Sequence, residues 1–210
     1  AREKAAKEKA KQERIASMKA KRARLASSLK SVNEKYAGSL NYISKDSTNL
    51  SFSAVSYRKD FNDESLEILK DAAADITELD LSATAITDAA AFSLGEFASL
   101  KSLKLNQTSI TDSSLPEIQK LNQLAVLNLH STAVTDAGIK NLEPMSSLKK
   151  VYLWNTKVTE AAAKSLEKTL TDKHQEAQQG LEEEDQVKLT PQVILGASSK
   201  PTAAPKPAAA

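Results

Sequence analysis

The sequence predicts an α/β repeat fold: a short right-handed solenoid of about four to five 24-residue units, with a long N-terminal helix and an extended C-terminal tail. One pattern recurs four times at a spacing of 24 residues, helix-forming residues precede it, and a polar, Pro- and Ala-rich segment follows it. A fixed period of this length is typical of solenoids, in which no unit buries its apolar face alone. The copies are Leu79-x-Leu81-x-x-Thr84-x-Ile86-Thr87-Asp88, Leu103-x-Leu105-x-x-Thr108-x-Ile110-Thr111-Asp112, Leu127-x-Leu129-x-x-Thr132-x-Val134-Thr135-Asp136 and Val151-x-Leu153-x-x-Thr156-x-Val158-Thr159-Glu160.

Residues 1–32 form the first predicted segment, a basic helix. Residues 2–31 are rich in Ala, Lys, Glu and Arg and contain no Gly or Pro, which favours a helix. Apolar residues from Ile15 onward recur at steps of three or four, so we expect the second half to pack and the first half to be solvated. Three roles are open: a tether, a helix that binds a partner or an anionic membrane surface, and a nucleic-acid arm. The last is disfavoured because no aromatic residues interleave the basic ones.

Charge is distributed unevenly along the chain. Residues 1–30 carry 11 basic and 3 acidic residues, so of the 29 basic and 27 acidic residues in the chain the rest carries 18 and 24. The sequence therefore predicts a basic arm beside a mildly acidic body.

Residues 33–75 are predicted to be an N-terminal capping unit. Residues 40–43 and 50–57 are expected to form strands, because apolar and aromatic residues lie there between polar turns. Phe61 to Glu64 is expected to open a helix that carries Leu66 and Leu69. This half-pattern is offset by 25 residues rather than 24, as expected of a degenerate terminal unit.

Residues 76–170 hold the regular units. In each unit the two apolar residues of Leu-x-Leu are expected to point from a short strand into the core, because side chains alternate along a strand. The Thr of each Thr-Asp pair is expected to cap a helix, whose dipole the acidic residue complements. The helix positions expected to be buried are Ala91, Leu94, Phe97, Leu115, Ile118, Leu121, Ile139, Leu142 and Met145, with Leu100, Leu124 and Leu148 leading to the next strand. A weaker last helix carries Ala163, Leu166 and Thr169.

Residues 171–210 are predicted to be a tail that follows the end of the repeats at Asp172. Its first part is polar and acidic, Val193 to Leu195 form one apolar patch, and residues 196–210 contain only Gly, Ala, Ser, Lys, Thr and Pro. Such a composition does not bury enough apolar surface to fold alone. We therefore expect any order in the tail to come from a partner or from the surface of the solenoid.

The four copies resemble short bacterial leucine-rich repeats, with Thr at the turn position where such repeats usually carry Asn. The phrases Leu127-Asn-Leu129-His130-Ser-Thr132-Ala-Val134-Thr135-Asp136-Ala-Gly138 and Val151-Tyr152-Leu153-Trp154-Asn155-Thr156 resemble the repeats of membrane-associated c-type cytochrome proteins of planctomycetes and verrucomicrobia. The resemblance covers residues 33–170 and implies a protein-binding module outside the cytoplasm, periplasmic or membrane-associated, near an electron-transfer assembly. The chain lacks the haem-attachment motif Cys-x-x-Cys-His, so no cytochrome activity carries over.

The residues argue against enzymatic chemistry, a metal site or a cofactor. The chain has no Cys and two His, His130 and His174, which stand in different settings without a metal-ligand spacing. Neither a Gly-rich phosphate loop nor Gly-x-Ser-x-Gly is present, and no apolar run approaches the length of a membrane span. The sequence begins with Ala1 and shows no signal peptide, so we expect a processed protein, a recombinant version or a fragment. The prediction is a non-enzymatic protein without a cofactor.

The outward-facing strand positions predict a partner-binding surface on the concave face of the solenoid. Aromatic residues collect at its C-terminal end, where Tyr152 and Trp154 would be neighbours, and both types are enriched at interface hot spots. Two alternatives are open for Trp154: it covers the end of the core, or residues 171–195 pack over it. The predicted partner-binding residues are Asp80, Lys104, Asn106, Asn128, His130, Lys150, Tyr152 and Trp154.

Three functions are compatible with this sequence. The first is an interaction or accessory subunit of a larger envelope or membrane assembly, with other protein subunits, including membrane or haem proteins, as partners and the termini as attachment arms. The second is a structural spacer appended to a membrane-bound c-type cytochrome. The third is peripheral binding to an anionic membrane through residues 1–31, where each Lys or Arg contributes about 1 kcal/mol.

Overall fold

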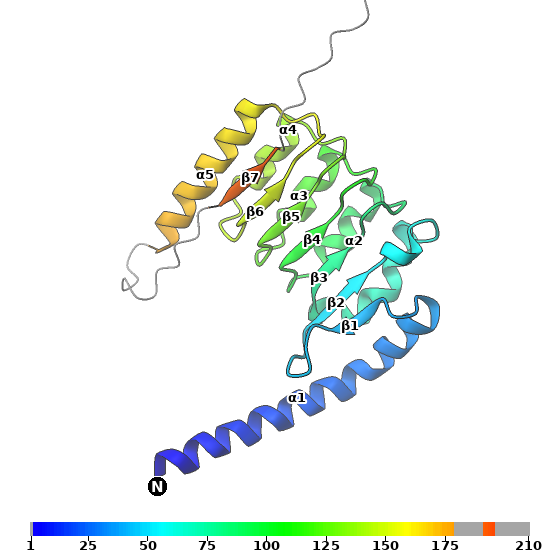
Figure 1. Ribbon diagram of the computed structural model, residues 1–210, viewed down its shortest axis with the longest axis vertical. Helices are drawn as coiled ribbons and strands as arrows, with labels where there is room; N and C mark the ends of the chain where they lie inside the picture. Colours follow the sequence, from blue (N-terminus) through cyan, green and yellow to red (C-terminus); the bar gives the residue numbers. More distant parts are fainter. Residues whose placement is uncertain (1, 179–190, 196–210) are drawn as a thin grey trace, which may run out of the picture.

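The computed structural model describes residues 2–178 and 191–195 and has an α/β fold (Figure 1). A long helix, α1 (Arg2–Lys35), precedes an open seven-stranded sheet with the strand order β1-β2-β3-β4-β5-β6-β7. Only β1 and β2 are antiparallel, and every later pair is parallel. The strands are β1 (Leu40–Tyr42), β2 (Leu50–Ser53), β3 (Ile76–Asp80), β4 (Ser102–Lys104), β5 (Val126–Asn128), β6 (Lys150–Tyr152) and β7 (Gln192–Ile194). The predicted α/β class and the long N-terminal helix are confirmed.

Short helices connect the parallel strands and cover one face of the sheet (Figure 1). Many of their turns are 3-10 turns, which repeat every three residues, and this explains why the apolar residues of these segments are spaced by three. The elements are η1 (Val55–Tyr57), η2 (Asp63–Asp75), η3 (Asp88–Ala90), α2 (Ala91–Gly95), η4 (Asp112–Ser114), α3 (Leu115–Ile118), α4 (Asp136–Ile139), η5 (Lys140–Leu142) and α5 (Glu160–Gln178). No helix in the described part of the chain is long and apolar enough to span a membrane.

The core lies between the sheet and these helices. Leu79, Leu103, Leu127 and Val151 are adjacent across β3 to β6, so the 24-residue period of the sequence is also the register of the parallel strands. All four are at most 1% exposed, and the predicted helix positions from Ala91 to Met145 are buried with them. In the last helix Leu170 is buried rather than Thr169, because α5 is an α-helix in which position i+4 continues the face.

The turn after each strand has the same conformation in the four segments. Residues Ala83, Gln107, Ser131 and Asn155 adopt positive φ angles of 53° to 59°. The next residue, a Thr in every case, donates its hydroxyl to the carbonyl three residues earlier, at 2.5 to 2.7 Å. The hydroxyl thus satisfies a carbonyl within its own turn, while the backbone N–H groups of 83, 107 and 131 reach the neighbouring turn.

Threonine caps and aspartates link successive segments. Each Thr of the Thr-Asp pairs accepts a bond from the backbone two residues later, which confirms the predicted N-caps at Thr87, Thr111 and Thr135. The sequence did not indicate that the carboxylate bonds the next segment: Asp112 accepts from the Thr135 backbone at 2.7 Å and from its hydroxyl at 2.6 Å. Asp63, Asp88 and Asp136 do the same for Thr87, Thr111 and Thr159.

Hydrogen bonds hold the carboxyl group of Asp88 in its ionised form. Partial burial on its own would raise the pKa of Asp88, but bonds from Ser114 and Thr111 outweigh it, and the pKa lies below its usual value. These bonds favour the charged form because all three donors point at the carboxylate.

Gly138 is required by this arrangement. A Cβ atom at Gly138 would lie 2.1 Å from Asp112 Oδ1, so Gly138→Ala must displace the carboxylate that bonds Thr135. We expect the free energy of unfolding in urea to fall by about 1–3 kcal/mol, although an Ala in an open helix position would stabilise by roughly 0.5–1 kcal/mol. The control is Gly95→Ala, where the nearest atom is the end of the flexible Glu117 side chain at 3.2 Å. Equal effects of the two substitutions would contradict this role of Gly138.

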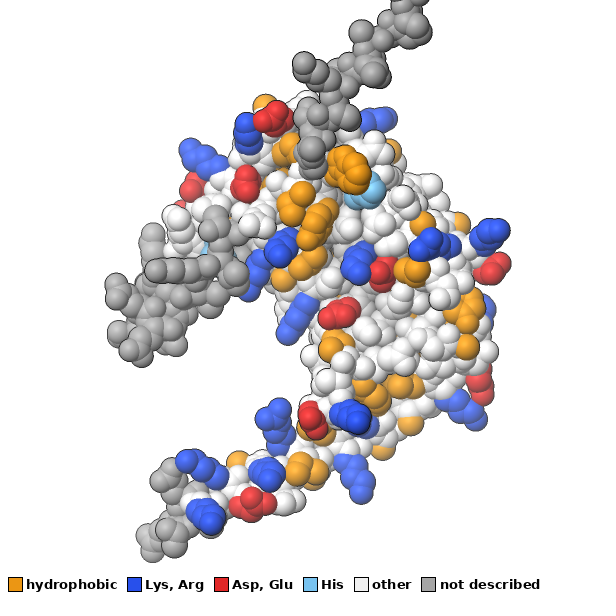
Figure 2. All heavy atoms as spheres, viewed as in Figure 1, with side chains coloured by type: hydrophobic (Ala, Val, Ile, Leu, Met, Phe, Trp, Pro, Cys, Tyr) orange, Lys and Arg blue, Asp and Glu red, His pale blue; other side chains and the backbone are white. Residues whose placement is uncertain are grey.

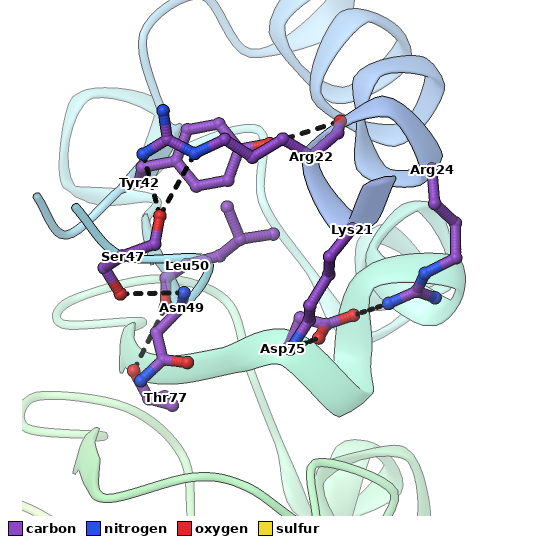
Figure 3. Close-up of polar contacts among 9 residues, drawn as sticks. All are labelled: Lys21, Arg22, Arg24, Tyr42, Ser47, Asn49, Leu50, Asp75 and Thr77. Carbon is purple, nitrogen blue, oxygen red and sulfur yellow. Dashed lines mark hydrogen bonds and ion pairs between the residues drawn. The ribbon is translucent and has the colours of Figure 1, made fainter. Parts of the chain in front are cut away.

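The second half of α1 packs on the N-terminal end of the sheet, as predicted, and continues to Lys35 rather than 31. Leu25, Val32 and Tyr36 are buried. Polar contacts reinforce the packing (Figure 3): Lys21 and Arg24 bind the buried carboxylate of Asp75 at 2.6 and 2.5 Å. Arg22 lies 4.3 Å over the Tyr42 ring and donates to the carbonyl of Ser47, as Figure 3 shows. It also donates to the carbonyls of Ser44 and Lys45 in the same β1–β2 turn.

The C-terminal part differs from the expected tail. The helix α5 continues past Asp172 to Gln178, and Gln192–Ile194 returns to the sheet as β7, parallel to β6. Of the predicted apolar patch, Val193 and Ile194 lie in this strand and Leu195 follows it; Val193 and Leu195 are partly buried and pack against the core. The remaining residues of the predicted tail, 179–190 and 196–210, lie outside the described residues.

Side chains of the two terminal helices cap both edges of the sheet. On β1, the Leu40 N–H donates to Asn33 Oδ1 at 3.1 Å, and the Asn33 amide donates to the Leu40 carbonyl at 2.8 Å. On β7, the Val193 N–H donates to Glu167 Oε1 at 3.4 Å. Exposed strand edges promote pairing with other chains, so this capping disfavours growth of the sheet by strand addition.

Candidate interaction surface

The uncovered face of the sheet carries the side chains that the sequence predicted to bind a partner. Asp80, Lys104, Asn128 and Tyr152 lie side by side on β3 to β6, and Ile194 of β7 extends this row. Lys150 belongs to the parallel row that starts at Glu78. The other predicted residues, Asn106, His130 and Trp154, each follow a strand by two residues. The structure thus brings all of them to one face, with an acidic end at β3 and an aromatic end at β6.

At the acidic end, the carboxylate of Asp80 is already engaged by neighbouring side chains. Lys104 Nζ lies 3.0 Å from Asp80 Oδ2, and Ser82 donates its backbone N–H to Asp80 Oδ1 at 3.1 Å. Ser82 Oγ also contacts Asp80 and lies 2.7 Å from Asn106 Oδ1. Burial on its own would raise the pKa of Asp80, but the bonds from Ser82 and Lys104 lower it below its usual value. The adjacent depression, about 210 Å³ and lined by residues of β2 to β4, is shallow and polar.

The aromatic end is built on a stack of two rings. The imidazole of His130 and the indole of Trp154 are nearly parallel, with an interplanar angle of 13° and ring centroids 4.7 Å apart. His130 Nε2 lies 3.0 Å from Ser131 Oγ, which accepts a bond from the Asn155 amide at 2.8 Å. The backbone N–H of His130 donates to Asn128 Oδ1 at 3.0 Å. The hydrogen bonds orient His130, and Trp154 packs on its ring by the stack alone and is 52% exposed.

Trp154 belongs to a larger apolar strip, which we define as Val126, Tyr152, Trp154 and Ile194. Figure 2 shows apolar side chains gathered over β6 and β7 beside a histidine. Sequence reasoning missed Ile194 because β7 was not expected in the sheet. The available signal was the apolar run Val193-Ile194-Leu195, which is too short to show a period; in the structure Val193 packs against the core and Ile194 extends the outward row.

Unpaired lysines border the apolar strip. Lys150 is exposed on β6, and Lys101 and Lys149 stand at the starts of β4 and β6. Within the described ranges none of the three makes an ion pair, in contrast to Lys104. The aromatic end of the face is therefore both apolar and positively charged.

The histidines and acidic residues of the described part of the chain do not form a metal-ligand cluster on this face. Among them, no three His, Cys, Asp or Glu side chains come together as ligands for a metal ion. His130 is engaged by Trp154 and Ser131, and His174 lies apart on α5. The groups that this face presents are stacked rings, apolar side chains, hydrogen-bonding groups and lysine charges.

Comparison with known protein families and with curated proteins found no match for the chain.

Proposed function

We propose that the chain is a leucine-rich repeat module that binds a protein partner through the uncovered face of its sheet and performs no catalysis. The 24-residue period, which coincides with the register of four parallel strands, supports the repeat assignment. Parallel strands stacked in sequence order present their outward side chains as columns, which is how repeat proteins recognise partners. The resemblance to cytochrome-associated repeats extends the proposal to an accessory subunit of an envelope or membrane assembly.

One observation carries the proposal: the only Trp of the chain is half exposed although its ring stacks on His130, whose own ring is hydrogen-bonded to Ser131. A rigid, exposed aromatic ring is the commonest kind of interface hot spot, because it loses little conformational entropy when it is buried. Tyr152 and Ile194 enlarge the apolar area beside it, and Lys150 and Asn128 supply the polar border.

The test compares Trp154→Ala with Phe92→Ala. Phe92 is a matched control because it is 71% exposed and lies on α2, on the covered face of the sheet. Affinity purification with mass spectrometry identifies candidate partners, and calorimetry with the purified partner then measures Kd. We expect Trp154→Ala to weaken binding about thirtyfold, which corresponds to roughly 2 kcal/mol, and Phe92→Ala to leave Kd unchanged. A partner that binds both variants like the wild type would refute the proposed surface.

A structural spacer is the second candidate, and the first half of α1 favours it. Residues 6–17 of this helix are exposed and rich in charge, which is typical of a helix that bridges solvent between domains. In that case the chain is recovered without a partner, and shortening α1 changes the distance between flanking domains but no binding constant.

A further inference from the structure

One side of the helix α1 changes from basic residues in its first half to buried apolar residues in its second half. An α-helix has about 3.6 residues per turn, so residues seven apart lie on nearly the same side. Counting back from the buried Val32 gives Leu25, also buried, then the half-buried Met18, then Lys11 and Lys4. In its second half, this side of α1 packs against the sheet and its covering helices, which together we call the body. In its first half, the same side carries basic residues.

This basic face, which we define as Lys4, Lys7, Lys11 and Arg14, includes one acidic position, Glu3, four residues before Lys7. Its members are spaced by three and four residues and span about 15 Å of helix. Glu13 lies on the opposite side of the helix, 3.9 Å from Lys9, and Glu8 lies at the flank, where it accepts from Gln12 at 2.9 Å. Lys11 and Arg14 have no ion pair within the described part of the chain.

Apolar side chains lie where the basic face meets the body. Ile15 is 49% exposed and follows Arg14, and Met18 is one turn further on. An exposed charge row that ends in a small apolar patch matches a partner with carboxylates along one side and an apolar residue at one end.

The position of the body limits which kinds of partner can reach the basic face. Because the basic face continues the packed face, it looks toward the same side of α1 on which the body lies. Figure 1 shows the first half of α1 projecting past the sheet and its covering helices, at an angle to the sheet. The projecting half of α1 and the body form an angle, and the basic face lies on the inner side of it. A flat membrane would collide with the body before it reached this face. A narrow polypeptide segment can reach the face without such a collision.

We propose that the basic face of α1 binds an acidic polypeptide segment, a helix with carboxylates at spacings of three and four residues, along the inner side of the projecting half of α1. This site is separate from the apolar strip and does not depend on the function proposed for it. It assigns to α1 a binding role in addition to any role as a tether.

The test uses the full chain and a labelled helical peptide with Glu at such spacings over about three turns, followed by fluorescence anisotropy at low salt. Two triple variants change the net charge equally: Lys4→Glu/Lys11→Glu/Arg14→Glu on the basic face, and Lys9→Glu/Lys19→Glu/Lys30→Glu off it. We expect the first to bind roughly tenfold more weakly or worse, because each exposed charge pair contributes a few-fold, and the second to bind within about twofold of the wild type. Circular dichroism checks that both remain helical.

The same proteins are titrated with phosphatidylserine vesicles and with a DNA duplex. Equal losses for the two triple variants would reduce the effect to net charge and overturn the proposal, as would the absence of peptide binding to the wild type. Tighter binding of vesicles or DNA that depends on the basic face would overturn it in favour of those partners. Trp154→Ala should bind the peptide like the wild type, which separates this site from the apolar strip.

Discussion

Replacing both cations that contact Asp75, in Lys21→Met/Arg24→Met, is expected to lower the free energy of unfolding by about 3–5 kcal/mol. The Asp75 side chain is 4% exposed, and Lys21 and Arg24 bind it from α1 at 2.6 and 2.5 Å (Figure 3). Without these cations the negative charge of the carboxylate is buried without a partner. An unpaired buried charge is among the most destabilising features that substitutions create.

The reverse substitution should cost much less. In Asp75→Ala the two cations lose their partner, but the Lys21 and Arg24 side chains are 37% and 58% exposed and regain water. We expect a loss of about 1–2 kcal/mol. The triple variant Lys21→Met/Arg24→Met/Asp75→Ala should recover most of the stability lost by the double variant.

Urea unfolding followed by circular dichroism measures all three variants. The decisive comparison is the double variant against the triple variant, since both lack the cations and only one keeps the buried carboxylate. If they are equally stable, the loss comes from the packing of the Lys and Arg stems and not from the unpaired charge.

The sequence predicted the periodic parts of the fold because their contacts are local or repeat at one spacing. Alternation along Leu79-x-Leu81 and its copies identified the buried strand positions, and the 24-residue period predicted which of them are neighbours. The N-cap threonines followed in the same way from residue types at a short spacing. The contact of His130 with Trp154 follows from the same register, because the two residues are 24 positions apart.

The contacts that sequence reasoning missed join residues far apart in the chain. Asp75 is 54 and 51 positions from Lys21 and Arg24, and no spacing rule relates a basic helix to one acidic residue among many. The strand β7 was missed because three residues carry little periodic signal and an acidic run separates them from α5. The edge caps at Asn33 and Glu167 depend on how the terminal helices lie against the sheet, which the sequence pattern does not report.

Phe61→Ala is expected to lower the free energy of unfolding by about 3–5 kcal/mol. Phe61 is fully buried, and its ring centroid lies 5.3 Å from those of Tyr36 and Phe52. Tyr36 follows α1 directly, so this aromatic cluster joins the end of α1 to β2. The control is Phe92→Ala, the same substitution at a side chain that is 71% exposed, which should change stability by less than about 0.5 kcal/mol.

The position of Phe61 also tests whether the molecule unfolds as one unit. Trp154, the only Trp, lies at the opposite end of the sheet and reports on that end by fluorescence, whereas circular dichroism reports on all helices. In a chain where each strand contacts only its neighbours, damage at one end reaches the other only through the intervening interfaces. Asp–Thr bonds cross every interface from Asp63–Thr87 to Asp136–Thr159, so we expect strong coupling and a fluorescence midpoint that shifts as far as the dichroism midpoint. An unchanged fluorescence midpoint in Phe61→Ala would mean that these bonds do not couple the two ends.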